Sequence, residues 1–459
     1  MEYRTEKDSL GEVKVPADKY WGAVTERSLE NFKIGNHPMP YELVRAIAEV
    51  KLAAARANAR LLPGRMTEEK LSLIERAASE IISGELIEHF PLSVFQTGSG
   101  TQTNMNVNEV IANRANELAG RRVLSPNDDV NMSQSSNDVF PTAMHLAVVK
   151  MTRDRVLPAI NGLVSELLSL EERSFGIVKS GRTHLQDATP IAFSQEVSGW
   201  RYSLECDYLM IEDTLRHLEA IALGGTAVGT GLNSPIGFDT LATEELSRIT
   251  GLSLRPSANK FHSLSSKSEL VFAHGALKAL AADLMKIAND VRWLASGPRL
   301  GLGEITIPAG EPGSSIMPGK VNPTQCEALT MVAVAVMAND SAVTVGASQG
   351  NLELNVYMPI IIKSYLDSLE LLSDGMSSFK ERCVSGIEVN RERMHSNLHM
   401  SLMLATALTP HIGYERAAEV VHLAHGDGLS LREACLRLGY MDEEGFDNAF
   451  HPEEMICSK

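Results

Sequence analysis

Apolar residues recur at every seventh position in several long segments of this chain. The rows are Leu270, Leu277, Leu284 and Val291 with Ala273, Leu280, Ile287 and Leu294; Val197, Leu204, Ile211 and Leu218; Val149, Val156, Leu163 and Leu170; and Ile362, Leu369 and Met376 with Tyr365, Leu372 and Phe379. Because this spacing keeps apolar side chains on one face of a helix, it predicts long helices packed side by side. Pro158 predicts a bend in one of them. Ser266 and Glu269 have the spacing of a capping box, which predicts where another begins.

The segment from Asn322 to about Val345 has a different pattern, because it is apolar on every face. Such a helix is expected to be buried all round, inside a large bundle or in a subunit interface. Its most apolar stretch, residues 328–338, is far shorter than the roughly 20 residues that a membrane span needs, so we expect no membrane partner. Five long helices with buried seams, and little strand-like alternation, predict an all-α fold with a long central bundle.

Composition narrows the class of protein. A chain of 459 residues with 44% hydrophobic and 22% charged residues is typical of a soluble protein with more than one domain. The formal charge of −16 argues against nucleic acid as a partner. The five cysteines are scattered and form no C-x-x-C pair, which is poor spacing for zinc, an iron–sulfur cluster or a disulfide framework. The first residues, MEYRTEKDSLGEV, lack the apolar region of a targeting signal. We therefore expect a cytoplasmic protein with reduced thiols and no metal.

Polar loops rich in glycine separate the predicted helices. They read FQTGSGTQTNMN (95–106), SPNDDVNMSQSSND (125–138), SGRTHLQDATP (180–190), GGTAVGTGLN (224–233) and GEPGSSIMPGKVNP (310–323). Their hydroxyls, amides and backbone N–H groups, with one lysine and one histidine, suit small carboxylate or phosphate anions. On residues alone, Lys320 is either part of a mobile lid or a solvated charge on a rigid connector. His184 is one of 13 histidines, and nothing in the pattern singles it out.

The run Gly313-Ser-Ser-Ile-Met-Pro-Gly-Lys-Val-Asn-Pro323 resembles the G-S-S-x-M-P-x-K-x-N-P signature of the fumarase/aspartase superfamily. Within this superfamily, three features of the chain resemble class II fumarases. Gly319 follows Pro318 where aspartases usually have Ala, a histidine stands in RTHLQDATP (182–190) where they usually have Gln, and KVNPTQCEA (320–328) also matches. The resemblance extends over essentially the whole chain.

This resemblance implies an all-α, fumarase/aspartase-like homotetramer. Its protomer would have an N-terminal domain (1–134), a central helical bundle domain (135–391) and a C-terminal domain (392–459). Four five-helix bundles would form a twenty-helix core, and each active site would collect loops from three subunits. The resemblance also implies that no cofactor is needed.

The implied activity is that of a lyase, the reversible hydration of fumarate to L-malate in the tricarboxylic acid cycle. Ser314 would be the base that removes the C3 proton, with Lys320 and backbone dipoles stabilising its alkoxide. The resulting carbanion would be held as an aci-carboxylate by fixed hydrogen-bond donors. His184, oriented by Glu327, would handle the C2 hydroxyl proton through a water.

The resemblance also implies two groups of binding residues. The substrate would be bound by Ser99, Gly100, Thr101, Arg122, Ser135, Ser136, Asn137, Thr183, Ser315, Val321 and Asn322. A second anion site would be formed by Ser125, Pro126, Asn127 and Asp128. Fumarases commonly have His-Pro-Asn-Asp there, so the serine removes a possible cation and puts carboxylate binding at this second site in doubt.

Two alternatives remain open on the sequence. One is a sister lyase such as an aspartase or a mesaconate hydratase, since one methyl group is worth only about 1–3 kcal/mol in a pocket. The other is a structural protein on the same fold, as in the lens δ-crystallins. The presence of Ser314, Lys320, His184 and Glu327 argues against the second.

Overall fold

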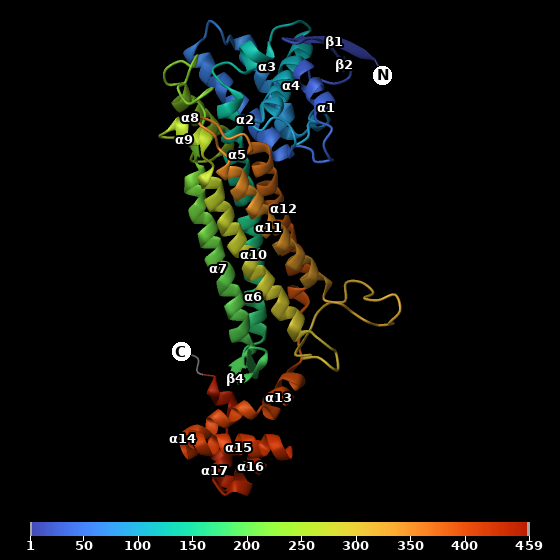
Figure 1. Cartoon of the computed structure of the whole chain (residues 1–459), viewed down its shortest axis with the longest axis vertical. Coiled ribbons are helices and arrows are strands. Elements are labelled where there is room, and N and C mark those ends of the chain that lie inside the picture. Colours follow the sequence, from blue (N-terminus) through green and yellow to red (C-terminus); the bar gives the residue numbers. More distant parts are fainter. Residues whose placement is uncertain (1, 457–459) are drawn as a thin grey trace. The chain divides into compact units, whose positions relative to one another are not determined.

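The computed structural model describes residues 2–456, and most of them lie in helices (Figure 1). Cys457 lies outside these residues. The helices are α1 (Ala23–Asn31), α2 (Tyr41–Leu61), α3 (Glu68–Ser83), α4 (Thr101–Ala119), α5 (Ser136–Met151), α6 (Leu157–Arg173), α7 (Phe193–Leu218), α8 (Phe238–Thr250), α9 (Lys260–Ser265), α10 (Ser268–Leu294), α11 (Thr324–Ser348), α12 (Met358–Arg382), α13 (Arg391–Met400), α14 (Thr409–Ile412), α15 (Tyr414–Asp427), α16 (Leu431–Leu438) and α17 (Glu443–Ala449).

Short strands and tight helical turns make up the remaining elements. The strands pair two by two: β1 (Tyr3–Asp8) with β2 (Gly11–Pro16), β3 (Val178–Thr183) with β4 (Gln186–Ala192), β5 (Ala220–Ile221) with β6 (Arg255–Pro256), and β7 (Ile305–Thr306) with β8 (Glu388–Val389). The turns are η1 (Ile87–His89), η2 (Pro126–Val130), η3 (Thr152–Val156), η4 (Val384–Gly386), η5 (Leu402–Leu408) and η6 (Pro452–Met455).

The seven-residue apolar rows lie where the sequence predicts them. Every residue of the rows in α7, α10 and α12 and in the segment from α5 to α6 is buried. A π-helical turn, η3, stands directly before Pro158, where a bend was expected. Because proline has no N–H to donate to the preceding turn, an irregular turn at this point is the expected consequence.

The chain divides into two compact units. Unit 1 comprises residues 2–158, 207–281 and 334–373, and unit 2 comprises residues 159–206, 282–333 and 374–456. Along the described chain, each passage from one unit to the other falls inside a long helix: α6, α7, α10, α11 or α12. The three domains expected from the resemblance, with boundaries at 134/135 and 391/392, stay a prediction.

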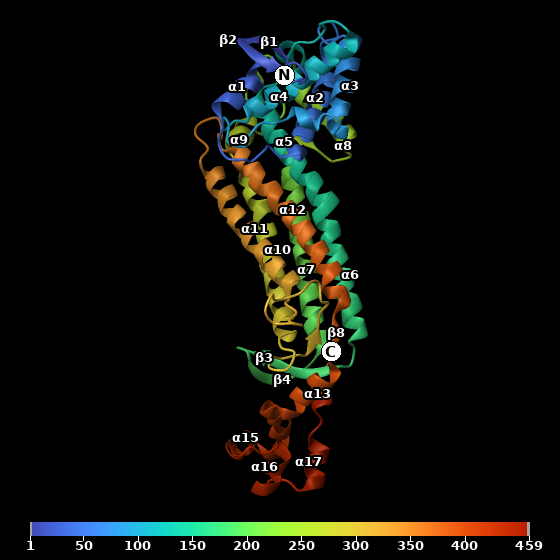
Figure 2. The same ribbon diagram turned by 90° about the vertical axis from the view of Figure 1, so that its right-hand side faces the viewer.

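Each unit has its own packing. In unit 1, α2 packs against α3, α5 and α8, and α3 packs against α4. In unit 2, α13 packs on β3, and the last helices enclose an apolar cluster that includes Leu404, Leu408, Val420, Cys435 and Phe446 (Figure 2).

The start of α10 differs from the prediction. The helix begins at Ser268, and Ser266 instead ends α9. The Glu269 carboxylate accepts from His262 Nε2 at 2.9 Å rather than closing a capping box with Ser266. The spacing was present, but a neighbouring histidine competes for the carboxylate.

Helix α11 is apolar over a longer stretch than residues 328–338 alone indicated. Its 25 residues include an 18-residue window with a mean hydropathy of 1.6, so by length and composition it could cross a membrane. Only 28% of that window is buried within the chain, and Met331, Val334 and Val345 are exposed. Asp340 is nevertheless buried, and it accepts from Lys278 Nζ at 2.6 Å. His274, which is also buried, lies with its Nδ1 3.1 Å from Asp340 Oδ1. A buried carboxylate with protein partners is typical of packing against protein, so the open faces of α11 suit other helices.

Candidate active site

Two helices of unit 1 begin at the same polar pocket. The pocket is lined by Thr101, Asn104, Met105, Asn131, Ser133, Gln134, Ser135, Ser136, Thr226, Ala227, Leu232 and Asn233. Helix α4 begins at Thr101 and α5 begins at Ser136. Because the N–H groups and dipole of a helix favour negative charge at its N-terminus, two such ends at one pocket favour an anion.

A chain of hydroxyl groups joins the two helix starts. Ser99 Oγ lies 2.9 Å from Thr101 Oγ1, which lies 2.8 Å from Ser136 Oγ. Gly100 between them has a φ of +71°, and a Cβ there would lie 2.2 Å from the Phe140 ring. The turn therefore requires glycine, and three expected binding residues are held together by it.

Asp138 connects the start of α5 to the loop at 224–233. Its carboxylate accepts from Ser135 N, Gly224 N and Thr226 N, each at 2.9 Å. Burial raises the pKa of Asp138, and the three N–H donors act against that rise. Asn137 adds a bond from its Nδ2 to Ala227 O at 2.8 Å. The loop at 224–233 is thus fixed against Ser135 and Ser136, and places Thr226 and Ala227 in the pocket wall.

A buried lysine lies behind the pocket wall. Lys51 Nζ donates to Asn131 Oδ1 at 2.8 Å and to Gln134 Oε1 at 3.1 Å. The same Asn131 oxygen accepts from Asn104 Nδ2 and from Asn108 Nδ2, both at 3.2 Å. Burial lowers the pKa of Lys51 to about 7, and the charge of Asp138 acts against this lowering. Lys51 therefore orders the amide side chains that face the pocket.

His184 lies at the tip of the β3–β4 hairpin in unit 2. Thr183 pairs with Gln186, and His184 and Leu185 form the two-residue turn with φ values of 56° and 60°. Both φ values are positive, as in a type I′ turn, whose twist matches that of the flanking strands. Such φ values strain residues other than glycine, asparagine or aspartate. Thr183 and His184 are exposed at this tip. The turn thus holds the exposed side chain of His184 in a defined position at the tip of the hairpin.

A buried carboxylate anchors the base of the hairpin. Glu304 Oε1 accepts from Arg182 Nη2 at 2.7 Å, and Glu304 Oε2 lies 2.9 Å from Lys179 Nζ. Burial alone would raise the pKa of Glu304, but Arg182 and Lys179 hold that pKa below its usual value. Glu304 therefore stays ionised, and the strand that leads to His184 is held on a fixed base.

The loop at 310–323 is closed by its own hydrogen bonds. Gly313 N donates to Lys320 O at 2.8 Å, and Asn322 Nδ2 donates to Gly313 O at 2.6 Å. Ser314 Oγ accepts from Ile316 N at 3.2 Å and from Met317 N at 3.1 Å. The segment projects from the ends of α10 and α11 (Figure 1). Two backbone donors aimed at the Ser314 oxygen would stabilise negative charge on it.

The other residues of this loop are directed to solvent. Ser315, Lys320 and Val321 are exposed, and so is Glu327 in the first turn of α11. Within the described part of one chain, no hydrogen bond or ion pair joins His184 to Glu327 or Lys320 to Ser314. Within the described residues of one chain, these groups therefore make no direct contact with one another.

Arg122 and the expected second anion site lie beyond the far end of α4. The 19 residues of α4 separate Thr101 from the loop that holds Arg122, which at 1.5 Å per residue is about 27 Å. Arg122 is exposed there. Ser125 caps the turn η2, because its Oγ accepts from Asp128 N at 3.3 Å and donates to Asp128 Oδ2 at 3.1 Å. Asn127 and Asp128 are exposed, and Pro126 has no N–H to offer.

Comparison with known proteins decides the family. The family model described as Lyase matches residues 11–338, and the one described as Fumarase C C-terminus matches residues 404–457. The chain is 55% identical to the class II fumarate hydratase of Bacillus subtilis (strain 168) and 54% identical to that of Helicobacter pylori (strain ATCC 700392 / 26695), over 100% of both chains in each case. The chain belongs to the class II fumarate hydratases.

The solved structures agree with this family. The crystal structure of recombinant class II fumarase from Schistosoma mansoni matches with a TM-score of 0.96 and 42% identity over 99% of each chain. The all-α fumarase/aspartase fold expected from the sequence is confirmed. Class II fumarate hydratases are hydro-lyases, so the expectation of a lyase is confirmed as well.

Several residues of the site were missed by the sequence analysis. Lys51, Asn104 and Asn131 reach the pocket region from separate segments, and no spacing in the sequence links them. Asp138 could have been found, because Ser135 and Asp138 have capping-box spacing and the structure contains that box. Its bonds to the loop at 224–233 had no sequence signal.

Proposed function

We propose that this chain catalyses the reversible hydration of fumarate to L-malate as its biological activity. Membership of the class II fumarate hydratases carries the proposal. The polar pocket with two helix N-termini supports it, because a dicarboxylate needs fixed donors for its oxygens. We propose that Ser99, Gly100, Thr101, Ser135, Ser136 and Asn137 bind one carboxylate of the substrate, with Thr183, Lys320, Val321, Asn322 and Ser315 supplied by other segments.

In the dehydration direction, Ser314 takes the C3 proton of malate. The proton passes to the Ser314 oxygen, and the electron pair moves into the adjacent carboxylate to give an aci-carboxylate. The N–H groups of Ile316 and Met317 already donate to that oxygen, which favours its anionic form. Lys320, on the same loop, contributes a positive charge. The loop geometry thus provides what a serine needs in order to act as a base.

His184 completes the reaction at C2. As the C2–O bond breaks, the imidazolium of His184 delivers a proton through a bound water, and hydroxide leaves as water. Glu327 orients the imidazole. The turn at His184 and Leu185 supports this role, because it presents the ring at the tip of an anchored hairpin.

We further propose that the sites form in a homotetramer and are shared between subunits. The candidate residues of one chain fall into separate groups at the pocket of unit 1, the hairpin tip and the loop at 310–323. The exposed apolar side chains of α11 suit the centre of a closed oligomer. A cytoplasmic location, no metal requirement and a role for Arg122 at a neighbouring subunit's site belong to the same proposal.

Ser125, Pro126, Asn127 and Asp128 bind no second carboxylate in this proposal. The Ser125 hydroxyl is engaged by its own turn, where it donates to Asp128 Oδ2 at 3.1 Å. The imidazole that fumarases commonly have at this position is replaced by serine.

Paired serine variants test the reaction and the role of Ser314 together. The wild-type enzyme should consume fumarate without ammonia, with kcat/KM for fumarate well above the values for mesaconate and aspartate. Ser314→Ala should lower kcat by roughly 10²–10⁴-fold. Ser315→Ala, the matched control on the same loop, should mainly raise KM. Equal turnover in the two variants would remove Ser314 as the base, and a preference for aspartate or mesaconate would overturn the proposed reaction.

A further inference from the structure

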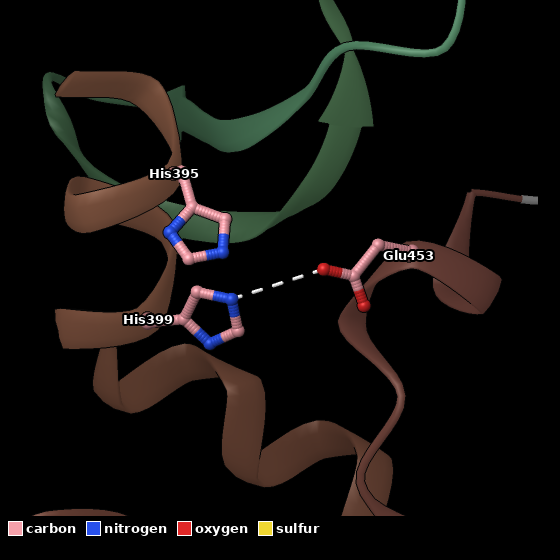
Figure 3. A group of neighbouring side chains, drawn as sticks. All are labelled: His395, His399 and Glu453. Carbon is pink, nitrogen blue, oxygen red and sulfur yellow. Dashed lines mark ion pairs between the residues drawn. The ribbon is translucent and has the colours of Figure 1, made fainter. Parts of the chain in front are cut away.

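Two histidines and a glutamate meet on the surface of unit 2, and none of them belongs to the proposed active site. His395 and His399 lie four residues apart on α13, so they project from the same side of the helix. Glu453 comes from η6, near the C-terminal end of the described chain, and its carboxylate points toward the rings (Figure 3). One ligand atom from each residue can be chosen so that all lie within 4.8 Å of one another.

The spacing of these atoms suits a metal ion after small side-chain rotations. His399 Nε2 lies 3.8 Å from Glu453 Oε1, and the two imidazole centroids are 4.2 Å apart. Ligands around a tetrahedral zinc ion lie about 3.3 Å apart, given metal–ligand bonds of about 2.0–2.1 Å. All three side chains are exposed, so a shift of this size meets no packed core.

The donor set favours a particular class of ion. Two neutral imidazoles and one carboxylate are ligands for divalent transition metals such as zinc, cobalt or nickel, whereas magnesium and calcium prefer oxygen alone. Histidines at i and i+4 of a helix are an established way to bind such an ion from one side. Three protein ligands leave at least one position for water.

The backbone around the histidines is fixed by other contacts. Arg393 donates to Leu302 O and Gly301 O, both at 3.1 Å, and Asn397 Nδ2 donates to Glu304 Oε1 at 3.2 Å. These bonds hold α13 in place through side chains other than the two histidines. The two histidine ligands are therefore held in position on α13, and Glu453 would provide the third ligand from η6.

We propose that His395, His399 and Glu453 bind one divalent transition-metal ion, which fastens the C-terminal segment of the chain to α13. The role is structural. The bound ion would add to the exposed ion pair of His399 and Glu453, the kind of contact that contributes about 0–1 kcal/mol. The hydration reaction does not depend on this site.

Metal titration of the untagged, full-length protein tests this proposal. After dialysis against EDTA, the protein should bind one Co²⁺ per chain, with visible absorption bands of a low-coordinate site, and Zn²⁺ should displace the cobalt. His399→Ala and His395→Ala should each weaken binding at least tenfold, in line with losing a ligand. Binding should also be weaker at pH 5 than at pH 7.5, because protons compete for the imidazoles.

Matched controls separate this site from other surface histidines and acids. His411→Ala removes an exposed histidine, and Glu454→Gln removes the neighbouring carboxylate in η6. Both should bind Co²⁺ as the wild type does, while Glu453→Gln should lose affinity. Zn²⁺ should slow removal of the C-terminal residues by carboxypeptidase in the wild type and not in His399→Ala. Cobalt binding unaffected by His395→Ala, His399→Ala and Glu453→Gln, or no binding at millimolar Co²⁺, would overturn the proposal.

Discussion

At the scale of single residues, the pocket of unit 1 depends on buried polar groups that do not themselves line it. Lys51 holds Asn131 and Gln134, and Asp138 holds the backbone of Gly224 and Thr226. The resemblance to the fumarase/aspartase superfamily pointed to the hydroxyls at 99–101 and 135–136, and the structure places several of them at this pocket. The sequence could not identify Lys51, because an isolated lysine within an apolar helix of the sequence has no pattern that marks its partners.

The lowered pKa of Lys51 predicts a dependence of stability on pH. Its folded-state value of about 7 lies below the value of about 10.4 for an unfolded lysine. Between these values the unfolded chain holds one more proton, so this residue makes the folded state more stable as pH rises. The free energy of unfolding changes by up to about 1.4 kcal/mol for each pH unit between these two pKa values. The stabilisation is complete above the unfolded pKa and is gone once the pH has fallen through 7.

Thermal unfolding at pH 7 and pH 9 measures this effect. The wild type should gain stability relative to Lys51→Met over this interval. Lys70→Met, which removes an accessible lysine paired with Asp129, should show the same change with pH as the wild type. Parallel pH profiles for the wild type and Lys51→Met would mean that Lys51 keeps an ordinary pKa in the fold.

At the scale of elements, the long helices were predictable and their ends were not. The seven-residue repeats in α7, α10 and α12 indicate a face that is buried along most of each helix. A single residue that departs from the repeat therefore does not change the prediction. At the start of α10, the Glu269 carboxylate accepts from His262 and Ser268 rather than from Ser266, and the spacing alone does not decide between these partners. The hairpin that carries His184 was taken for a loop, because neither His184 nor Leu185 is a usual residue for its turn.

The strained turn gives a prediction for the hairpin. Leu185 is 63% exposed and has a φ of 60°, a conformation that costs a residue with a Cβ about 1–2 kcal/mol. Leu185→Gly should therefore leave the melting temperature unchanged or raise it, since relief of strain offsets the greater freedom of the unfolded chain. Leu168→Gly, at an exposed position of α6, should destabilise the protein by at least about 1 kcal/mol. Equal losses in both variants would show that the turn stores no strain.

At the scale of the whole molecule, the main feature to explain is that the candidate residues belong to three different segments: the pocket loops of unit 1, the β3–β4 hairpin and the loop at 310–323. Among the described residues of one chain, no hydrogen bond or ion pair joins His184 to the loop at 310–323, and α11 leaves apolar side chains exposed. Both observations are accounted for if neighbouring subunits cover α11 and each active site is completed by loops of different chains. The expectation of a helix buried on every side then holds for the oligomer rather than for one chain.

Mixing two inactive variants tests this shared-site account most directly. Tetramers of His184→Asn alone, or of Lys320→Ala alone, should each be nearly inactive. After the two are unfolded together and refolded, subunits combine at random, and a site that takes His184 and Lys320 from different chains is complete in about a quarter of cases. Activity should return to roughly a quarter of the wild-type value. If native mass spectrometry confirms mixed tetramers and activity stays at the level of the separate variants, both residues of a site come from one chain and the account is contradicted.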